Sequence, residues 1–101
     1  MKRITGLAVA IILFSSFSNF SAGQADIYKG KKVFESKCAK CHGTDGTKGK
    51  WGAKNLQVSR LGDPEMRTII TKGKRIMPAW GQRLTDDEMI SVMDYIKTLR
   101  R

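Results

Sequence analysis

Two cysteines and a histidine lie within five residues of one another, in the segment Cys38-Ala39-Lys40-Cys41-His42. They are the only cysteines and the only histidine in the chain. The Cys-x-x-Cys-His pattern is typical of covalent attachment of a c-type haem. Cysteines three residues apart lie about one helical turn from each other, so both thiols can reach the two vinyl groups on one edge of a porphyrin. The adjacent histidine can then bind the iron as its proximal ligand.

Other uses of paired cysteines fit this sequence less well. A zinc site needs four ligands, and Cys38, Cys41 and His42 supply three. A thioredoxin-like pair begins a helix in a βαβ context, whereas this pair follows a predicted helix and no convincing strand pattern is present. A disulfide between residues three apart would close a very small loop and stabilise the fold little. A chance match is the remaining alternative, because only three of the five positions are fixed.

The iron of such a haem needs a second axial ligand, and the chain has no second histidine to supply it. Methionine, lysine and an open site are the alternatives. Met77 precedes Pro78, which favours an extended backbone, and it lies in a predicted loop where its sulfur is free to project. The other methionines of the domain fall on predicted helices, where packing explains them. We therefore predict His42 and Met77 as axial ligands, which leaves electron transfer as the chemistry.

The N-terminus has the pattern of a secretory signal peptide. The basic pair Lys2-Arg3 precedes an apolar run over residues 7–14, and a serine-rich stretch follows. The run is shorter than the roughly 20 residues of a membrane span. We predict a signal peptide over residues 1–25, cleaved near Ala25, and one exported domain over residues 26–101. Export predicts a periplasmic location.

The composition bounds the class of protein further. The chain has 101 residues with 19 Lys and Arg against 9 Asp and Glu, a formal net charge of +10. This length allows one domain, and a hydrophobic fraction of 41% argues against disorder. Because basic residues surround the haem motif and fill two predicted loops, we expect docking to acidic redox partner proteins. Export argues against a nucleic-acid partner. We also expect transient contact with an anionic membrane surface. The protein is expected to be a monomer.

Helical periodicity predicts the first element of the domain. It runs from Asp26, the expected N-cap, to about Lys40 and ends at the cysteines. Gly30, Phe34 and Cys38 recur on one helical face. Gly30 predicts a notch where a second helix crosses closely. A basic, glycine-rich loop is predicted for residues 43–62.

Two further helices follow this loop. The second is predicted to begin with Asp63 as N-cap and Pro64 in the first turn, and to stop at Gly73. A loop over residues 72–84 leads to the last helix, which opens with the capping box Thr85-Asp86-Asp87-Glu88. Its apolar stripe consists of Met89, Val92, Met93, Ile96 and Leu99. The predicted fold is all-α.

These motifs resemble those of the small monohaem class I cytochromes c, over essentially the whole exported domain. The matching motifs are Gly30-x-x-x-Phe34, Cys38-x-x-Cys41-His42-Gly43, Asp45-Gly46, Met77-Pro78-Ala79-Trp80, Leu84-Thr85-Asp86-Asp87-Glu88 and Tyr95-Ile96. The resemblance implies a cytochrome c fold, with three to four helices wrapped around one covalent haem c. It also implies that the first and last helices cross near Gly30 and Tyr95.

One stretch departs from the family pattern. Many members have a proline after the haem-binding histidine, just before an Asn-Leu or similar pair, and its carbonyl accepts the second ring proton of the histidine. Here the matching residues are Ala53-Lys54-Asn55-Leu56, without proline. Any backbone carbonyl can accept this proton, so the sequence leaves open the bond that would orient His42.

We therefore predict a soluble periplasmic one-electron carrier, not an enzyme, that shuttles electrons between respiratory or redox-enzyme partners. Two alternatives stay open. One is a gas-binding or peroxidase-like haem protein with an open sixth site, for which Arg75, Lys74 or Trp80 would have to supply a distal polar group. The other is an electron-entry subunit held on a larger oxidoreductase.

Overall fold

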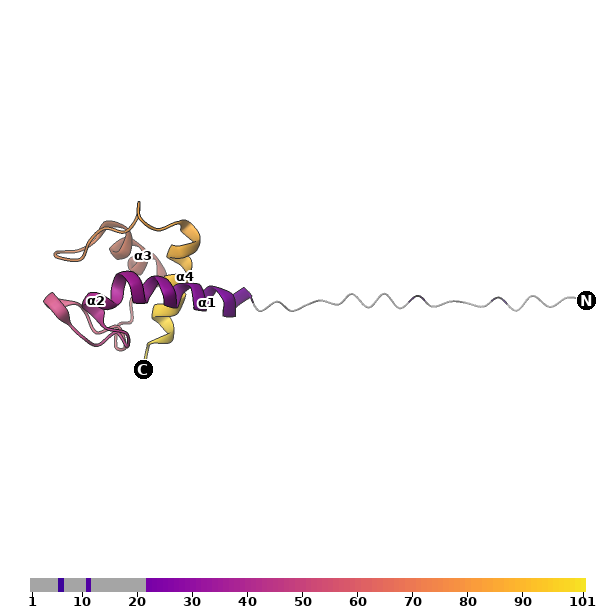
Figure 1. Cartoon of the computed structure of the whole chain (residues 1–101), viewed down its shortest axis with the longest axis horizontal. Helices are drawn as coiled ribbons and strands as arrows, with labels where there is room; N and C mark the ends of the chain where they lie inside the picture. Colours follow the sequence, from indigo (N-terminus) through magenta and orange to yellow (C-terminus); the bar gives the residue numbers. More distant parts are fainter. Residues whose placement is uncertain (1–5, 7–10, 12–21) are drawn as a thin grey trace, which may run out of the picture.

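The computed structural model describes residues 6, 11 and 22–101. Its helical elements are α1 (Ala22–Val33), the π-helical turn η1 (Phe34–Cys38), α2 (Ala39–His42), the 3₁₀ turn η2 (Lys50–Gly52), α3 (Asp63–Lys72) and α4 (Asp86–Thr98). Elements α1, η1 and α2 follow one another without a break and form one helical rod, next to α4 (Figure 1). Within the described residues there is no strand, and the β pairing consists of one isolated bridge. The all-α prediction is confirmed.

The start of the rod differs from the prediction. Helix α1 begins at Ala22, four residues before Asp26, so Asp26 is not the N-cap of this helix. The helix extends upstream because the preceding residues include two alanines and a glutamine, which are good helix formers. The signal peptide predicted for residues 1–25 lies almost entirely outside the described residues and stays a prediction. Cleavage near Ala25 would remove the first turn of α1 and leave Asp26 at the new N-terminus.

Helices α1 and α4 cross at Gly30 with their backbones in contact. A β-carbon on Gly30 would overlap the carbonyl oxygen of Ser91 and would lie 3.0 Å from the β-carbon of Tyr95. One turn further along α1, the fully buried ring of Phe34 packs on that of Tyr95, with 5.3 Å between the ring centroids and an interplanar angle of 55°. This tilted arrangement suits the quadrupoles of two aromatic rings. The predicted notch and crossing are confirmed.

The core gathers around the apolar stripe of α4. The buried residues of this core are Val33, Phe34, Met66, Ile70, Leu84, Met89, Val92, Met93 and Ile96. Leu99, the last residue of the stripe, is partly buried and packs against them. The predicted stripe is therefore confirmed. Three of the methionines are part of this core, as expected for packing residues, whereas Met77 lies outside it and is half-buried.

Helix α3 begins without the cap predicted for it. Its N-cap is Gly62, and Asp63 is already the first helical residue. The carboxylate of Asp63 accepts two hydrogen bonds from Lys97 Nζ of α4, each 3.1 Å, so it is engaged in joining two helices rather than in capping one. The predicted stop is correct: Gly73, with φ 73°, ends the helix and donates its N–H to the carbonyl of Ile69.

Helix α4 begins with the predicted capping box. The hydroxyl of Thr85 accepts from the N–H of Glu88 at 3.1 Å, and the carboxylate of Glu88 accepts from the N–H of Thr85 at 3.0 Å. The second of these bonds favours the ionised carboxylate and lowers the pKa of Glu88 below its ordinary value of 4.5.

Gly30→Ala should destabilise the folded protein by about 1–3 kcal/mol, because the new methyl group forces α1 and α4 apart. Denaturant unfolding of the haem-loaded protein measures this change. Gly62→Ala is the matched control, since its β-carbon would meet nothing nearer than 3.8 Å, and it should cost less than about 1 kcal/mol. Equal losses in the two variants would contradict the close crossing.

The lowered pKa of Glu88 gives a pH-dependent contribution to stability. Because the folded-state pKa lies below the unfolded one, the carboxylate stabilises the fold above the unfolded pKa, and this contribution is lost as pH falls through the folded value. The difference in unfolding midpoint between the wild type and Glu88→Gln should therefore be largest near pH 7 and shrink toward pH 3. A difference that grows as the solution becomes more acidic would contradict the capping role.

Candidate functional site

The Cys-x-x-Cys-His motif lies at the far end of the N-terminal helical rod. Cys38 is the last residue of η1, and Cys41 and His42 belong to α2. In η1 the N–H of Ala39 donates to the carbonyl of Phe34, a step of five residues. A π turn holds more residues than an α turn, so it rotates the motif about the helix axis relative to an unbroken α-helix. Sequence periodicity missed this turn, because no residue type marks it.

The two thiols are free and half-buried. Burial raises the pKa of Cys38 to about 11, which the nearby Lys37 partly offsets and Cys41 reinforces. A thiol with this pKa stays protonated at neutral pH, whereas redox-active pairs need a lowered pKa. The pair also ends a helix, as predicted, and lacks the dipole of a helix N-terminus. These features favour attachment chemistry over thiol–disulfide exchange.

The ring of His42 is oriented by a backbone carbonyl. Its Nδ1 atom lies 3.1 Å from the carbonyl oxygen of Lys54. Because a carbonyl can only accept, Nδ1 is the donor of this bond, and Nε2 is the ring nitrogen left for a metal. A histidine ring held in this way is oriented to bind a metal through Nε2. The bond that the sequence left open is therefore present, and Lys54 makes it in place of a proline.

The loop that carries Lys54 is held by several backbone contacts. It turns back at once after α2, where Gly43 has φ 80° and the N–H of Lys48 donates to the carbonyl of His42 at 2.8 Å. Further along, the N–H of Leu56 donates to the carbonyl of Gly46 at 2.9 Å. The loop is therefore folded into a defined shape rather than left open, which keeps the Lys54 carbonyl in place.

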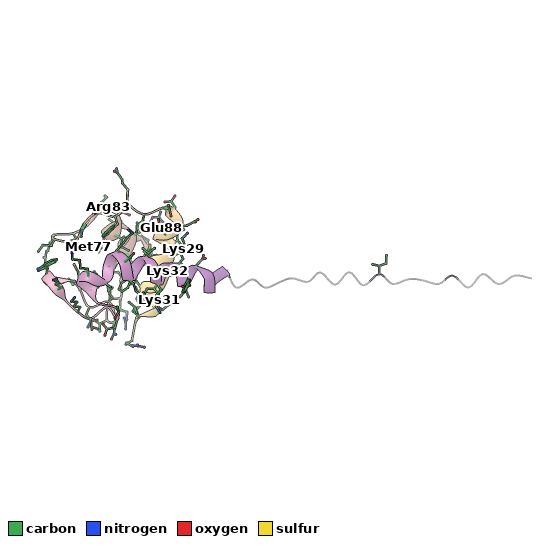
Figure 2. The ribbon with its side chains drawn as sticks, viewed as in Figure 1. Lys29, Lys31, Lys32, Met77, Arg83 and Glu88 are labelled. Atoms are coloured by element: carbon green, nitrogen blue, oxygen red, sulfur yellow. The ribbon has the colours of Figure 1, made fainter. Side chains whose placement is uncertain are left out.

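Met77 lies on the loop between α3 and α4, half-buried, as predicted. Its N–H donates to the carbonyl of Lys74 at 3.0 Å and its carbonyl accepts from the N–H of Lys74 at 3.3 Å, which closes a tight turn. Within this turn Arg75 has φ 55°, an uncommon conformation for a residue with a side chain. Met77 lies toward the side of the molecule where α2 ends (Figure 2).

The second half of this loop caps the C-terminus of α3. The N–H of Trp80 donates to the carbonyl of Ile70 at 2.8 Å, and the N–H of Gly81 donates to that of Thr71 at 3.1 Å. The last carbonyls of a helix have no partner within it, so they are available to hold the loop. Met77 thus projects from a segment fixed on both sides.

The motif and the Met77 loop meet on the same core. Cys38, Met77 and Trp80 all pack against the buried cluster around α4. Together the chain offers two unpaired thiols, an imidazole with a free Nε2 and a thioether, which is a donor set that fits one iron porphyrin held covalently.

Among the residues that the structure describes, no helix is both long and apolar enough to cross a membrane.

Comparison with known proteins agrees with this arrangement. A family model described as cytochrome C oxidase, cbb3-type, subunit III matches residues 25–96. Cytochrome c6 of Gloeothece citriformis is 35% identical over 101 residues, which cover 94% of this chain and 91% of that protein. Cytochrome c6 of Leptolyngbya boryana is 40% identical over 78 residues, which cover 71% of this chain and 91% of that protein.

The fold and the site define a small haem-binding domain for electron transfer. The chain belongs to the class I c-type cytochromes, the family of small monohaem proteins that carry one covalently bound haem c. It is an electron-transfer protein and not an enzyme. The predicted cytochrome c fold is confirmed.

Lys54→Pro should preserve the site, because the residue contributes a backbone carbonyl to His42. The preceding residue, Ala53, has φ −56° and ψ 132°, the extended conformation that a following proline requires. We expect an unchanged reduction potential and a gain of about 0.4–1 kcal/mol in unfolding free energy from the stiffer unfolded chain. Lys54→Ala controls for the lost charge. A shifted potential in the proline variant alone would show that the carbonyl had moved.

Proposed function

We propose that Cys38 and Cys41 hold the haem covalently and that His42 and Met77 are the axial ligands of its iron. The protein would then carry single electrons between redox partners. The observation that best supports this proposal is the bond from His42 Nδ1 to the carbonyl of Lys54, since it leaves Nε2 free and aimed by a fixed ring.

The protein residues set how the site behaves. The haem supplies a one-electron couple when it is bound. The carbonyl of Lys54 would fix the ring of His42 and strengthen it as a ligand. The thioether of Met77 would favour the ferrous state and raise the reduction potential. With both His42 and Met77 as ligands, the site would leave no position on the iron for water or a substrate, which suits electron transfer.

An open sixth site is less well supported. Such a site needs a distal polar group, and the sequence offered Arg75, Lys74 or Trp80. Lys74 and Arg75 are exposed in the turn before Met77, and the indole of Trp80 lies beside Lys37 and Arg83. The same turn holds Met77 through two backbone hydrogen bonds, which favours a closed site.

We further propose that redox partners dock on a basic surface formed by the loops around the site. No Asp or Glu occurs between Asp45 and Asp63, where four Lys and Arg occur, nor between Glu65 and Asp86, where five occur. Charge of one sign attracts acidic proteins over long range and speeds their encounter in a salt-dependent way. The same surface suits transient contact with an anionic membrane.

Export to the periplasm and a place between respiratory or redox-enzyme partners are also part of the proposal. The N-terminal pattern of the sequence supports export. A second candidate role is that of a subunit bound to a larger oxidoreductase. The matching family model, described as a subunit of a cbb3-type oxidase, favours it.

Met77→Ala tests the ligand assignment. We expect loss of the long-wavelength ferric band that reports iron–sulfur bonding, a lower reduction potential, and carbon monoxide binding to the reduced protein. The matched controls are Met66→Leu and Met93→Leu, which change buried core methionines and should keep the band. A band that survives in Met77→Ala but disappears in either control would assign the ligand elsewhere.

A further inference from the structure

The indole ring of Trp80 lies close to two cationic side chains. Nζ of Lys37 is 5.6 Å from the ring centroid, and Cζ of Arg83 is 5.3 Å from it. Both distances fall within the roughly 6 Å over which a cation is attracted to an aromatic face. Trp80 itself is half-buried and packs against the core. It stands three residues after Met77, on the same loop.

The contact with Lys37 joins two parts of the chain that are far apart in sequence. Two other cation–π contacts, Lys32 over Tyr28 at 5.0 Å and Lys50 over Trp51 at 4.4 Å, each stay within one local segment. Lys37 instead belongs to η1 and directly precedes Cys38, whereas Trp80 belongs to the loop between α3 and α4. This pair therefore bridges the haem-attachment segment and the methionine loop.

We propose that Lys37 and Arg83 are positioning residues for Met77. Lys37 holds the Trp80 ring against the segment that carries Cys38, Cys41 and His42. Arg83, on the same loop as Trp80, holds the orientation of that ring. Together they keep the loop in the place from which Met77 reaches the iron. This inference rests on the proposed function, in which His42 and Met77 bind opposite sides of one iron. The bridge then ties the loop of one axial ligand to the helix of the other.

The loop can transmit this restraint because its backbone is fixed on either side of Trp80. The N–H of Trp80 is bonded to the carbonyl of Ile70, and the N–H of Arg83 is bonded to the carbonyl of Trp80 at 2.9 Å. Arg83 lies on this loop after Met77, before α4 begins (Figure 2). When a foreign ligand displaces Met77 and the loop moves outward, the contact between Lys37 and Trp80 must break, because it joins the loop to another segment.

Imidazole titration of the ferric, haem-loaded protein measures how easily Met77 is displaced. Lys37→Gln and Arg83→Gln should each raise the imidazole affinity about 2- to 5-fold, the factor expected for one partly exposed cation–π contact. Lys37→Arg and Arg83→Lys keep a cation over the ring and should restore the wild-type affinity. Lys32→Gln and Lys50→Gln remove the same charge from other aromatic rings and should leave the affinity unchanged.

Amide hydrogen exchange provides a readout that does not depend on the iron. In Lys37→Gln the amides of Trp80 and Gly81 should exchange about 2- to 5-fold faster, while those of the buried part of α4 keep their rates. Equal acceleration in α4 would indicate general loosening and would overturn the proposal. An imidazole affinity in Lys37→Gln and Arg83→Gln equal to that of the controls would also overturn it.

The same titration separates this inference from the proposed function. If the wild type shows the long-wavelength ferric band and Met77→Ala abolishes it, the ligand assignment holds, and a failure of the Lys37 and Arg83 variants counts against the positioning role alone. If the wild type and Met77→Ala bind imidazole equally well, Met77 is not a ligand. Both proposals then fail together.

Discussion

The absence of a side chain at position 30 lets two helices of this protein pack backbone against backbone. Because Gly30 lies against the carbonyl of Ser91, the backbones of α1 and α4 are in contact, and the tilted pair of rings of Phe34 and Tyr95 holds α1 there. The rod that begins with α1 ends in the Cys-x-x-Cys-His motif, so the crossing also determines where the motif lies. The methionine loop is positioned by α3, which precedes it in the chain and is joined to α4 by the Asp63–Lys97 ion pair.

Peptide groups, more than side chains, position the residues of the site. The carbonyl of Lys54 orients His42, and the terminal carbonyls of α3 hold the loop of Met77 through Trp80 and Gly81. A backbone carbonyl is available from any residue type, which explains how a lysine can stand where related proteins have a proline. The identity of a side chain matters at the positions proposed to bond to the haem, and at Lys37 and Trp80, which are proposed to restrain the methionine loop.

Much of this molecule could be predicted from local sequence. Four features depend on residues close together in sequence or on a single residue type. They are the cysteine spacing, the capping box of α4, the end of α3 at Gly73 and the close crossing at Gly30. Two expected caps were wrong: Asp26 lies inside a longer helix, and Asp63 pairs with Lys97 instead. The π turn, the Lys54 carbonyl and the Lys37–Trp80 contact could not be predicted, because they arise from backbone geometry or from segments brought together by folding.

The proposed function requires that the sulfur of Met77 bind the iron opposite His42. Proton NMR of the reduced, haem-loaded protein tests it directly, because the ring current of a porphyrin shifts a methyl group held above the iron far upfield. We expect one such three-proton methionine signal, assigned to Met77 through its neighbours on the loop. A spectrum with no upfield methionine methyl, or with one assigned to Met66, Met89 or Met93, would contradict it.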